Sequence, residues 1–250
     1  MNCRRLLSSG SLAVLLFSCV MICLPSAAKE KNEGQKNIVD SGSFGIFRSG
    51  ARVATETFTI EQNAQGSVIS SEFKTSQGEQ VAEQSSQLQL TPSAEIRRYD
   101  WKETNPEKLQ VSVTPNDPFL VEHFNSPESK DQDQSFLLPA STSILDDYFF
   151  VQREVLAWRY LASACKTEKG VPACPLHQKV QFGALNPHAR ASLSVSIQFA
   201  GRDKLNIRGS EQEYSRFDLT SEGGDWSFWL NDQLKVVRLV NDAGTEIIRD

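Results

Sequence analysis

Apolar and polar residues alternate with a period of two through most of this chain after residue 43. In residues 51–60, Val53 and three threonines alternate with Ala54, Glu56, Phe58 and Ile60, and the stretch at 192–199 alternates over its whole length. Successive side chains of a strand point to opposite faces, so this pattern predicts sheets with one buried face and one solvated face. The expected strands are 44–47, 51–60, 67–74, 81–90, 95–101, 108–113, 179–182, 191–199, 204–208, 213–219, 226–230, 234–240 and 245–248.

The connections between these strands are short and rich in turn residues. Ser49-Gly50, 222–225 and 241–244 are examples, and the strand starts are spaced by roughly 10–14 residues, which favours antiparallel neighbours over parallel crossovers. Residues 114–135 are different because they hold three prolines and the polar run SPESKDQDQS. This segment is predicted to be a long loop, either a functional lid or a disordered excursion.

One segment, residues 144–164, has a helical pattern. Ser143 and Asp146 have the spacing of a capping box, and Asp146 and Asp147 would then lie in the first turn, where carboxylates favour the helix dipole. Adjacent helical residues diverge by about 100°, so this acidic pair is not expected to act on one substrate atom. Apolar residues cover most of the helix circumference. We therefore expect a curved sheet to wrap the helix, unless part of its face binds an apolar ligand.

The first 28 residues have the pattern of a secretory signal peptide. Arg4 and Arg5 precede an apolar run at 11–24, and Ser26-Ala27-Ala28 supplies small residues for cleavage after Ala28. An uncleaved anchor and lipidation at Cys19 are the alternatives, although Phe17 is bulky for a lipobox. The expected protein is therefore exported, periplasmic or secreted. Residues 29–42 are expected to be a flexible lead-in, and 43–250 a single β-rich domain.

Charge argues against nucleic acid as a partner. The formal net charge is −5, and cleavage after Ala28 removes two arginines and no acidic residue, giving −7. Lysines and arginines are also dispersed along the chain. An acidic chain without a basic cluster has no electrostatic attraction to nucleic acid or to an anionic membrane.

Cleavage would leave two of the five cysteines, Cys165 and Cys174. In an oxidising compartment such a close pair is expected to form a disulfide, here directly after the predicted helix. A redox pair would favour the C-x-x-C spacing, which is absent, and a zinc site needs about four ligands where only His177 lies nearby.

Motifs of the common enzyme classes are absent, namely a phosphate-binding Gly-rich loop, G-x-S-x-G, H-E-x-x-H and an EF-hand loop. Glu122 and His123 beside Asp117 were considered as a metal or acid–base site, but no further ligand has suitable spacing. His177 and His188 fall in predicted loops, where a single histidine is usually solvated. No catalytic residue, metal site or cofactor is predicted, and the protein is expected not to be an enzyme.

The chain resembles a known group of proteins in its order of elements: β-hairpins, one aromatic-rich helix and a closing Trp-x-x-Trp strand. The segments on which this resemblance rests are 44–60, 144–161 and 225–239 (DWSFWLNDQLKVVRL). They resemble uncharacterised exported bacterial proteins built as one curved antiparallel sheet around a helix, with the half-barrel shape of periplasmic lipoprotein carriers. The resemblance implies a mainly β (α+β) fold, and it carries no specific activity.

Three functions remain open. The first is a non-enzymatic envelope carrier that binds a lipid or other apolar ligand between sheet and helix. The second is a fully packed scaffold that interacts with envelope proteins, and the third is an enzyme with a site built from loops. The residues expected to line an apolar pocket in the first case are Tyr148, Phe149, Trp158, Trp226 and Phe228.

The disulfide is testable directly. A thiol assay on denatured, unreduced protein lacking residues 1–28 is expected to detect no free thiol, because its two cysteines, Cys165 and Cys174, are bonded to each other. Two free thiols per chain would contradict the disulfide.

Overall fold

The computed structural model describes residues 37–75, 81–127, 129–168 and 171–250. The predicted signal peptide, Cys19 and residues 29–36 of the predicted lead-in lie outside this part of the chain. The described elements are β1 (Asn37–Arg48), β2 (Ala51–Asn63), β3 (Gly66–Thr75), β4 (Glu83–Leu90), β5 (Ile96–Asn105), β6 (Leu109–Asn116), β7 (Phe119–Ser126), β8 (Ser129–Phe136), β9 (Ser143–Ile144), α1 (Val151–Ala164), β10 (Lys166–Glu168), β11 (Val171–Ala173), β12 (Lys179–Asn186), β13 (Ala191–Ile207), β14 (Ser210–Ser221), β15 (Trp226–Leu230), β16 (Val236–Asn241) and β17 (Thr245–Arg249).

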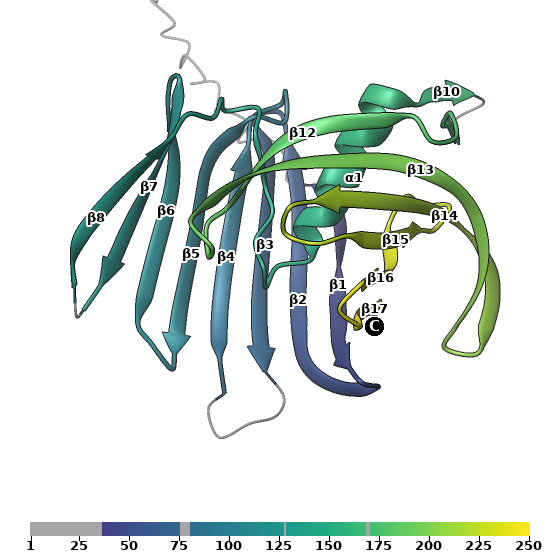
Figure 1. The fold of residues 1–250 in the computed structure, drawn as a ribbon, viewed down its shortest axis with the longest axis horizontal. Coiled ribbons are helices and arrows are strands. Elements are labelled where there is room, and N and C mark those ends of the chain that lie inside the picture. Colours follow the sequence, from purple (N-terminus) through teal and green to yellow (C-terminus); the bar gives the residue numbers. More distant parts are fainter. Residues whose placement is uncertain (1–36, 76–80, 128, 169–170) are drawn as a thin grey trace, which may run out of the picture. The chain divides into compact units, whose positions relative to one another are not determined.

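Fifteen of these strands form one sheet, in the order β8-β7-β6-β5-β4-β3-β2-β1-β17-β16-β15-β14-β13-β12-β9. The first and last described strands, β1 and β17, pair at its middle, for example Phe44 with Arg249. Within the described residues β8 and β9 end the sheet without pairing to each other, so the curved sheet stays open. Its two halves lie on different sides of α1 (Figure 1). The predicted fold class is confirmed.

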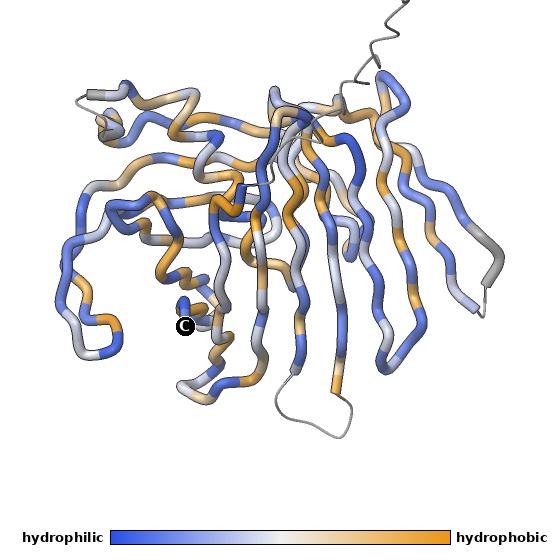
Figure 2. Tube along the Cα trace, turned by 180° about the vertical axis from the view of Figure 1, so that it is seen from behind, coloured by the Kyte–Doolittle hydropathy of each residue, from blue (hydrophilic) through white to orange (hydrophobic). Residues whose placement is uncertain are grey.

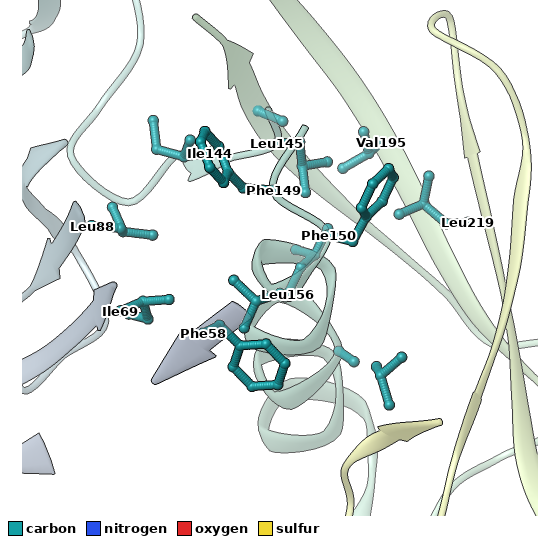
Figure 3. Packing of buried hydrophobic residues seen from close by; sticks show 14 of the residues in the cluster. Phe58, Ile69, Leu88, Ile144, Leu145, Phe149, Phe150, Leu156, Val195 and Leu219 are labelled. Atoms are coloured by element: carbon teal, nitrogen blue, oxygen red, sulfur yellow. The ribbon is translucent and has the colours of Figure 1, made fainter. Parts of the chain in front are cut away.

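The alternation along each strand separates a buried inner face from a solvated outer face. In β2 the side chains of Ala54, Glu56, Phe58 and Ile60 are buried, and the intervening threonines are exposed or half-buried. Figure 2 shows the resulting change between hydrophilic and hydrophobic residues along the strands. The inner faces of both halves and α1 share one apolar core, part of which is drawn in Figure 3.

The helix is shorter than predicted, because α1 begins at Val151 and not at residue 144. Ser143 and Ile144 form β9, which pairs in parallel with β12, and the Leu145 amide donates to the carbonyl of Leu185. The capping box at Ser143 and Asp146 is therefore wrong, and the two aspartates do not lie in the first turn. Pairing to a strand that is distant in sequence has overridden the local helical pattern.

The predicted long loop at 114–135 is also wrong. It contains the ends of the β6–β7 and β7–β8 hairpins, and Pro115 lies within β6 opposite Leu120. Its polar composition has a different cause: β8 is an edge strand, and residues 132–135 are exposed or half-buried. Polar, charged edge strands are usual because they discourage pairing with other chains.

The predicted flexible lead-in at 29–42 is corrected where it is described, since residues 37–42 belong to β1. Asp40 is buried, and its carboxylate accepts hydrogen bonds from Arg249 Nη2 at 2.7 Å and contacts Lys235 Nζ at 2.6 Å. Asp40, the charged residue of 37–42, therefore belongs to a buried ion-pair network with Lys235 and Arg249.

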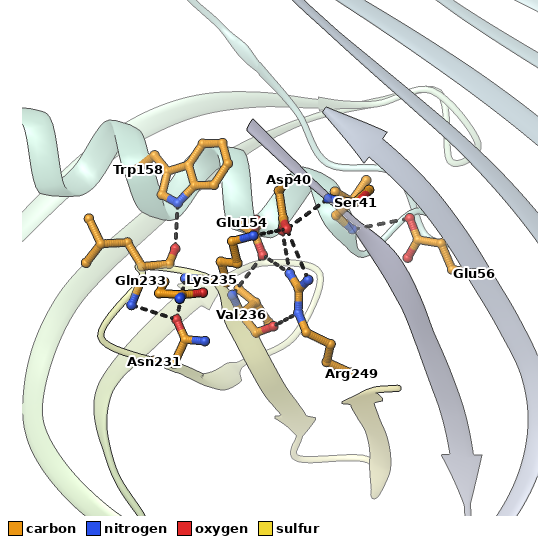
Figure 4. Close-up of polar contacts among 12 residues, drawn as sticks. Asp40, Ser41, Glu56, Glu154, Trp158, Asn231, Gln233, Lys235, Val236 and Arg249 are labelled. Carbon is orange, nitrogen blue, oxygen red and sulfur yellow. Dashed lines mark hydrogen bonds and ion pairs between the residues drawn. The ribbon is translucent and has the colours of Figure 1, made fainter. Parts of the chain in front are cut away.

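Two glutamates tie α1 to the sheet. Glu56 of β2 accepts hydrogen bonds from the amides of Phe150 at 2.7 Å and Val151 at 3.3 Å, so a side chain distant in sequence caps the helix N-terminus. Glu154 accepts from the Val236 amide of β16 at 2.7 Å and from Arg249 Nη2 at 2.8 Å (Figure 4). Burial raises the pKa of Glu56 to about 7 and that of Glu154 to about 8.

These carboxyls predict how stability depends on pH. Between the ordinary glutamate pKa of 4.5 and the raised values, the folded protein binds more protons than the unfolded chain, so the free energy of unfolding falls as pH rises. Asp40 acts oppositely: burial alone would raise its pKa, but hydrogen bonds with Glu154, Arg249 and Lys235 lower it to about 2. Its contribution is lost as pH falls from about 4 toward 2.

Urea unfolding is therefore expected to give a free energy of unfolding higher at pH 5 than at pH 8 by on the order of 2–5 kcal/mol. In Glu154→Gln, which keeps a neutral hydrogen-bonding group, roughly two fifths of this difference should disappear, because Glu56 and Glu122 keep their raised pKa values. Equal stability at the two pH values, or greater stability at pH 8, would show that these glutamates are ionised throughout.

Candidate functional site

A pocket of about 650 Å³ lies at the C-terminal end of α1, and we call it the helix-end pocket. The helix end, the β10–β11 hairpin, the β13–β14 ribbon and the loop after β15 all contribute to it. Its lining residues are Leu161, Pro172, Ala173, Cys174, Phe199, Arg202, Glu213, Ser215, Phe217, Leu230, Asn231, Asp232 and Leu234.

The floor of the helix-end pocket is aromatic and belongs to the core. Phe217 stands 5.4 Å, centroid to centroid, from both Phe199 and Phe228, and it is edge-on to Tyr160 of α1 at 5.6 Å. The register of β13 and β14 shifts between Phe199 and Gly201, where Gly201 has a φ of +124°. Such bulges bend a ribbon and redirect side chains, and this one lies at the pocket floor.

A disulfide and a side-chain hydrogen bond stabilise the walls of the helix-end pocket. The Cys165–Cys174 disulfide closes the β10–β11 hairpin against the end of α1, as the sequence predicted, and Cys174 itself lines the pocket. Opposite, Trp158 Nε1 donates to the carbonyl of Leu234 at 2.6 Å and fixes the loop between β15 and β16 (Figure 4).

The rim is polar and carries both signs of charge. Arg202 pairs with Glu213 at 3.0 Å and with Asp232 at 3.2 Å. Phe199 and Leu234 are only partly buried, so apolar surface remains available below the rim. The pocket can therefore hold an apolar group while a polar end of the same ligand stays at the mouth.

The five residues predicted to line an apolar pocket do not gather at one place. Phe149 and Phe228 are fully buried in the core, and Trp226 packs on Phe150 with a centroid distance of 5.8 Å. Trp158 supports the helix-end pocket through its hydrogen bond without lining it. Tyr148 lies near the other end of the helix, 5.1 Å from the ring of Phe73.

Near the N-terminal end of α1, a buried polar centre surrounds Asp146. Its Oδ2 atom accepts from Tyr99 Oη at 2.7 Å and lies 2.7 Å from His188 Nδ1, while Oδ1 accepts from the Tyr148 amide. Asp146 is fully buried, and the His188 side chain is 11 % exposed. Sequence reasoning placed His188 in a solvated loop, and no local signal joins residues this far apart in the chain.

Glu122 lies beside this centre, on the inner face of β7. Its side chain is fully buried, 3.6 Å from Arg190 Nε, and burial raises its pKa to about 7 although Arg190 and His188 act to lower it. His123, its neighbour in sequence, points outward and pairs with Asp133 at 2.7 Å, so the two residues considered together in sequence occupy opposite faces of the strand.

The other hollows of the described residues are less suited to an apolar ligand than the helix-end pocket. Hollows of about 450, 430 and 490 Å³ lie over the strands β2–β5, β5–β8 and β13–β16, and polar side chains make up most of their lining. Among the described residues, no three His, Cys, Asp or Glu side chains are grouped so as to hold a metal ion. The same part of the chain contains no helix long and apolar enough to span a membrane.

No family model matches this chain, and no curated protein matches it. Among solved structures, it is similar to the crystal structure of a β-barrel-like protein of Domain of Unknown Function DUF1849 from Brucella abortus. The TM-score is 0.53 at 8 % sequence identity, over 84 % of this chain and 94 % of that one. At this identity the likeness is one of fold alone, a single-sheet β fold of unknown function.

Proposed function

We propose that this protein is an exported, non-enzymatic binding or carrier protein whose apolar ligand occupies the helix-end pocket. The observation that carries the proposal is the composition of that pocket, with Leu161, Phe199, Phe217, Leu230 and Leu234 below a polar rim. Its volume of about 650 Å³ falls within the roughly 300–1,000 Å³ typical of small-molecule sites.

The ligand position differs from the one expected from sequence. Phe149, Val151, Leu156 and Tyr160 of the helix region are 0–1 % exposed, so side chains fill the space between α1 and the sheet. A ligand is therefore placed at the end of the helix, where Phe199 and Leu234 keep exposed apolar surface. An acyl chain with a polar head suits this arrangement because the rim offers Arg202, Glu213 and Asp232.

Export is part of the proposal and has two supports. The first 28 residues have the pattern of a signal peptide, and the Cys165–Cys174 disulfide is compatible with an oxidising compartment. The sequence resemblance to lipoprotein carriers predicts a role, namely movement of an apolar molecule through the cell envelope.

A packed interaction protein of the envelope is the second candidate. The buried interior favours it, because a scaffold needs no cavity and the described core residues around α1, such as Phe149 and Leu156, are almost fully buried. The two candidates differ in one property, namely saturable binding at the helix-end pocket.

The test uses protein lacking residues 1–28 and a fluorescent long-chain fatty acid. Saturable binding is expected, together with lipid in organic extracts of the purified protein examined by mass spectrometry. Phe199→Ser should weaken binding about tenfold, since it removes part of the roughly 1.5–3 kcal/mol that burial of such a side chain provides.

Leu205→Ser is the matched control. Leu205 lies in the same strand as Phe199 but packs with Tyr214 and Trp229, outside the main core. This variant should keep the wild-type affinity. Absence of both co-purified lipid and saturable probe binding would remove the carrier and leave the packed interaction protein.

A further inference from the structure

The turn between β12 and β13, residues 187–190, rests against the inner face of β5–β7. The ring of His188 lies 3.7 Å, centroid to centroid, from Trp101 of β5, and the guanidinium of Arg190 lies 5.4 Å from the ring centroid of Phe124 of β7. Trp101 and Phe124 both pair with Val111 of β6, so the turn spans three adjacent strands.

The residues around His188 are suited to binding a cation. The His188 imidazole contacts two aromatic rings, Trp101 at 3.7 Å and Tyr148 at 4.6 Å between centroids, both at tilted angles. Its Nδ1 atom lies 2.7 Å from the buried carboxylate of Asp146. Aromatic faces attract cations through their quadrupoles, and this attraction strengthens where water is excluded. A buried carboxylate adds a charge-assisted hydrogen bond to any N–H group held between the rings.

The surroundings are rich in carboxyl groups. Burial raises the pKa of Tyr148, and the nearby carboxylates of Asp147, Glu103 and Asp146 raise it further. His188 interacts electrostatically with both Glu103 and Glu122. Three arginines lie near the centre: Arg190 faces Glu122, Arg153 Nη1 donates to the Asp146 carbonyl at 3.1 Å, and Arg48 acts to lower the pKa of Tyr148.

The turn itself is incompletely bonded where it docks. His188 Nε2, Arg190 Nε and both carboxyl oxygens of Glu122 are buried without a hydrogen-bond partner. A buried polar atom without a hydrogen bond destabilises the docked turn, although the charges of Arg190 and Glu122 still attract each other across 3.6 Å. Arg190 also has a φ of 50°, a conformation that is unfavourable for a residue with a side chain. Lifting the turn would return these atoms to water.

We propose that Trp101, Tyr148 and Asp146 form a binding site for a planar nitrogen cation, such as an imidazolium, amidinium or aromatic ammonium group, and that His188 occupies this site as an internal ligand. An entering cation places its planar group against Trp101 and Tyr148 and donates an N–H to Asp146 Oδ2. That oxygen keeps the hydrogen bond that it accepts from Tyr99 Oη. His188 and Arg190 leave together, because they belong to one short turn. This site is separate from the helix-end pocket, since it lies near the opposite end of α1.

The first experiment uses the wild-type protein and benzamidine, a planar amidinium, with neutral benzamide as the matched probe. Benzamidine is expected to bind saturably and at least tenfold more tightly than benzamide. Saturation should increase amide hydrogen exchange of residues 188–190, where the Ala189 amide now donates to Asn186 Oδ1. Absence of benzamidine binding, or binding that leaves exchange of this turn unchanged, overturns the proposal.

The second experiment removes the internal ligand. His188→Gly is expected to bind imidazole at least tenfold more tightly than the wild-type protein, detected as a rise in Tm with imidazole concentration. His123→Gly is the matched control, because His123 also pairs with an aspartate at 2.7 Å but is 47 % exposed on the outer face. Tyr148→Leu in the His188→Gly background should abolish most of the gain.

Equal imidazole responses in the His188→Gly and His123→Gly variants would also overturn the proposal. Stabilisation of His188→Gly by neutral cyclopentanol as strong as that by imidazole would reduce the site to a plain cavity and overturn the preference for a cation. If His188→Gly does not fold, the wild-type comparison of benzamidine with benzamide decides the question alone.

Discussion

The attachment of one helix to both halves of a single sheet is the constraint on which the rest of this structure depends. Glu56 of β2 holds the N-terminus of α1, and Glu154 in the first turn of the helix bonds to β16 and to Arg249 of β17. Because β1 and β17 pair at the centre of the sheet, both anchors lie near the line where the two halves meet. The sheet can curve around the helix without closing into a barrel.

This arrangement decides where ligands have room. The helix fills the interior between the two halves with side chains such as Phe149, Leu156 and Tyr160, and the core there is continuous. Open space is left at the ends of the helix. At its C-terminal end the disulfide hairpin and the β13–β14 ribbon extend past the helix and enclose the helix-end pocket. Near the N-terminal end of the helix, His188 of the β12–β13 turn occupies the corresponding space.

The strands and their buried faces follow from local pattern, because a period of two needs only neighbouring residues to be recognised. In β2, Ala54, Phe58 and Ile60 lie on the buried side of the strand, as the alternation predicts. The sequence predictions are wrong where contacts with residues distant in the chain determine the role of a side chain. Asp146 appeared as a helix cap in the sequence, yet in the fold it bonds Tyr99 and His188.

The sequence by itself determined the fold class, one curved antiparallel sheet with a single buried helix, and it also paired Cys165 with Cys174. Periodicity and helix amphipathicity can be recognised within short segments, and the cysteine count needs only the sequence. None of these features requires the tertiary structure to be known. Only the tertiary structure decided that α1 begins at Val151, that the pocket lies at its far end, and that His188 is buried. Those features depend on contacts that the local pattern does not show, such as Leu145 with Leu185, Asp146 with His188 and Trp158 with Leu234. Their geometry is set by packing of the whole sheet around the helix.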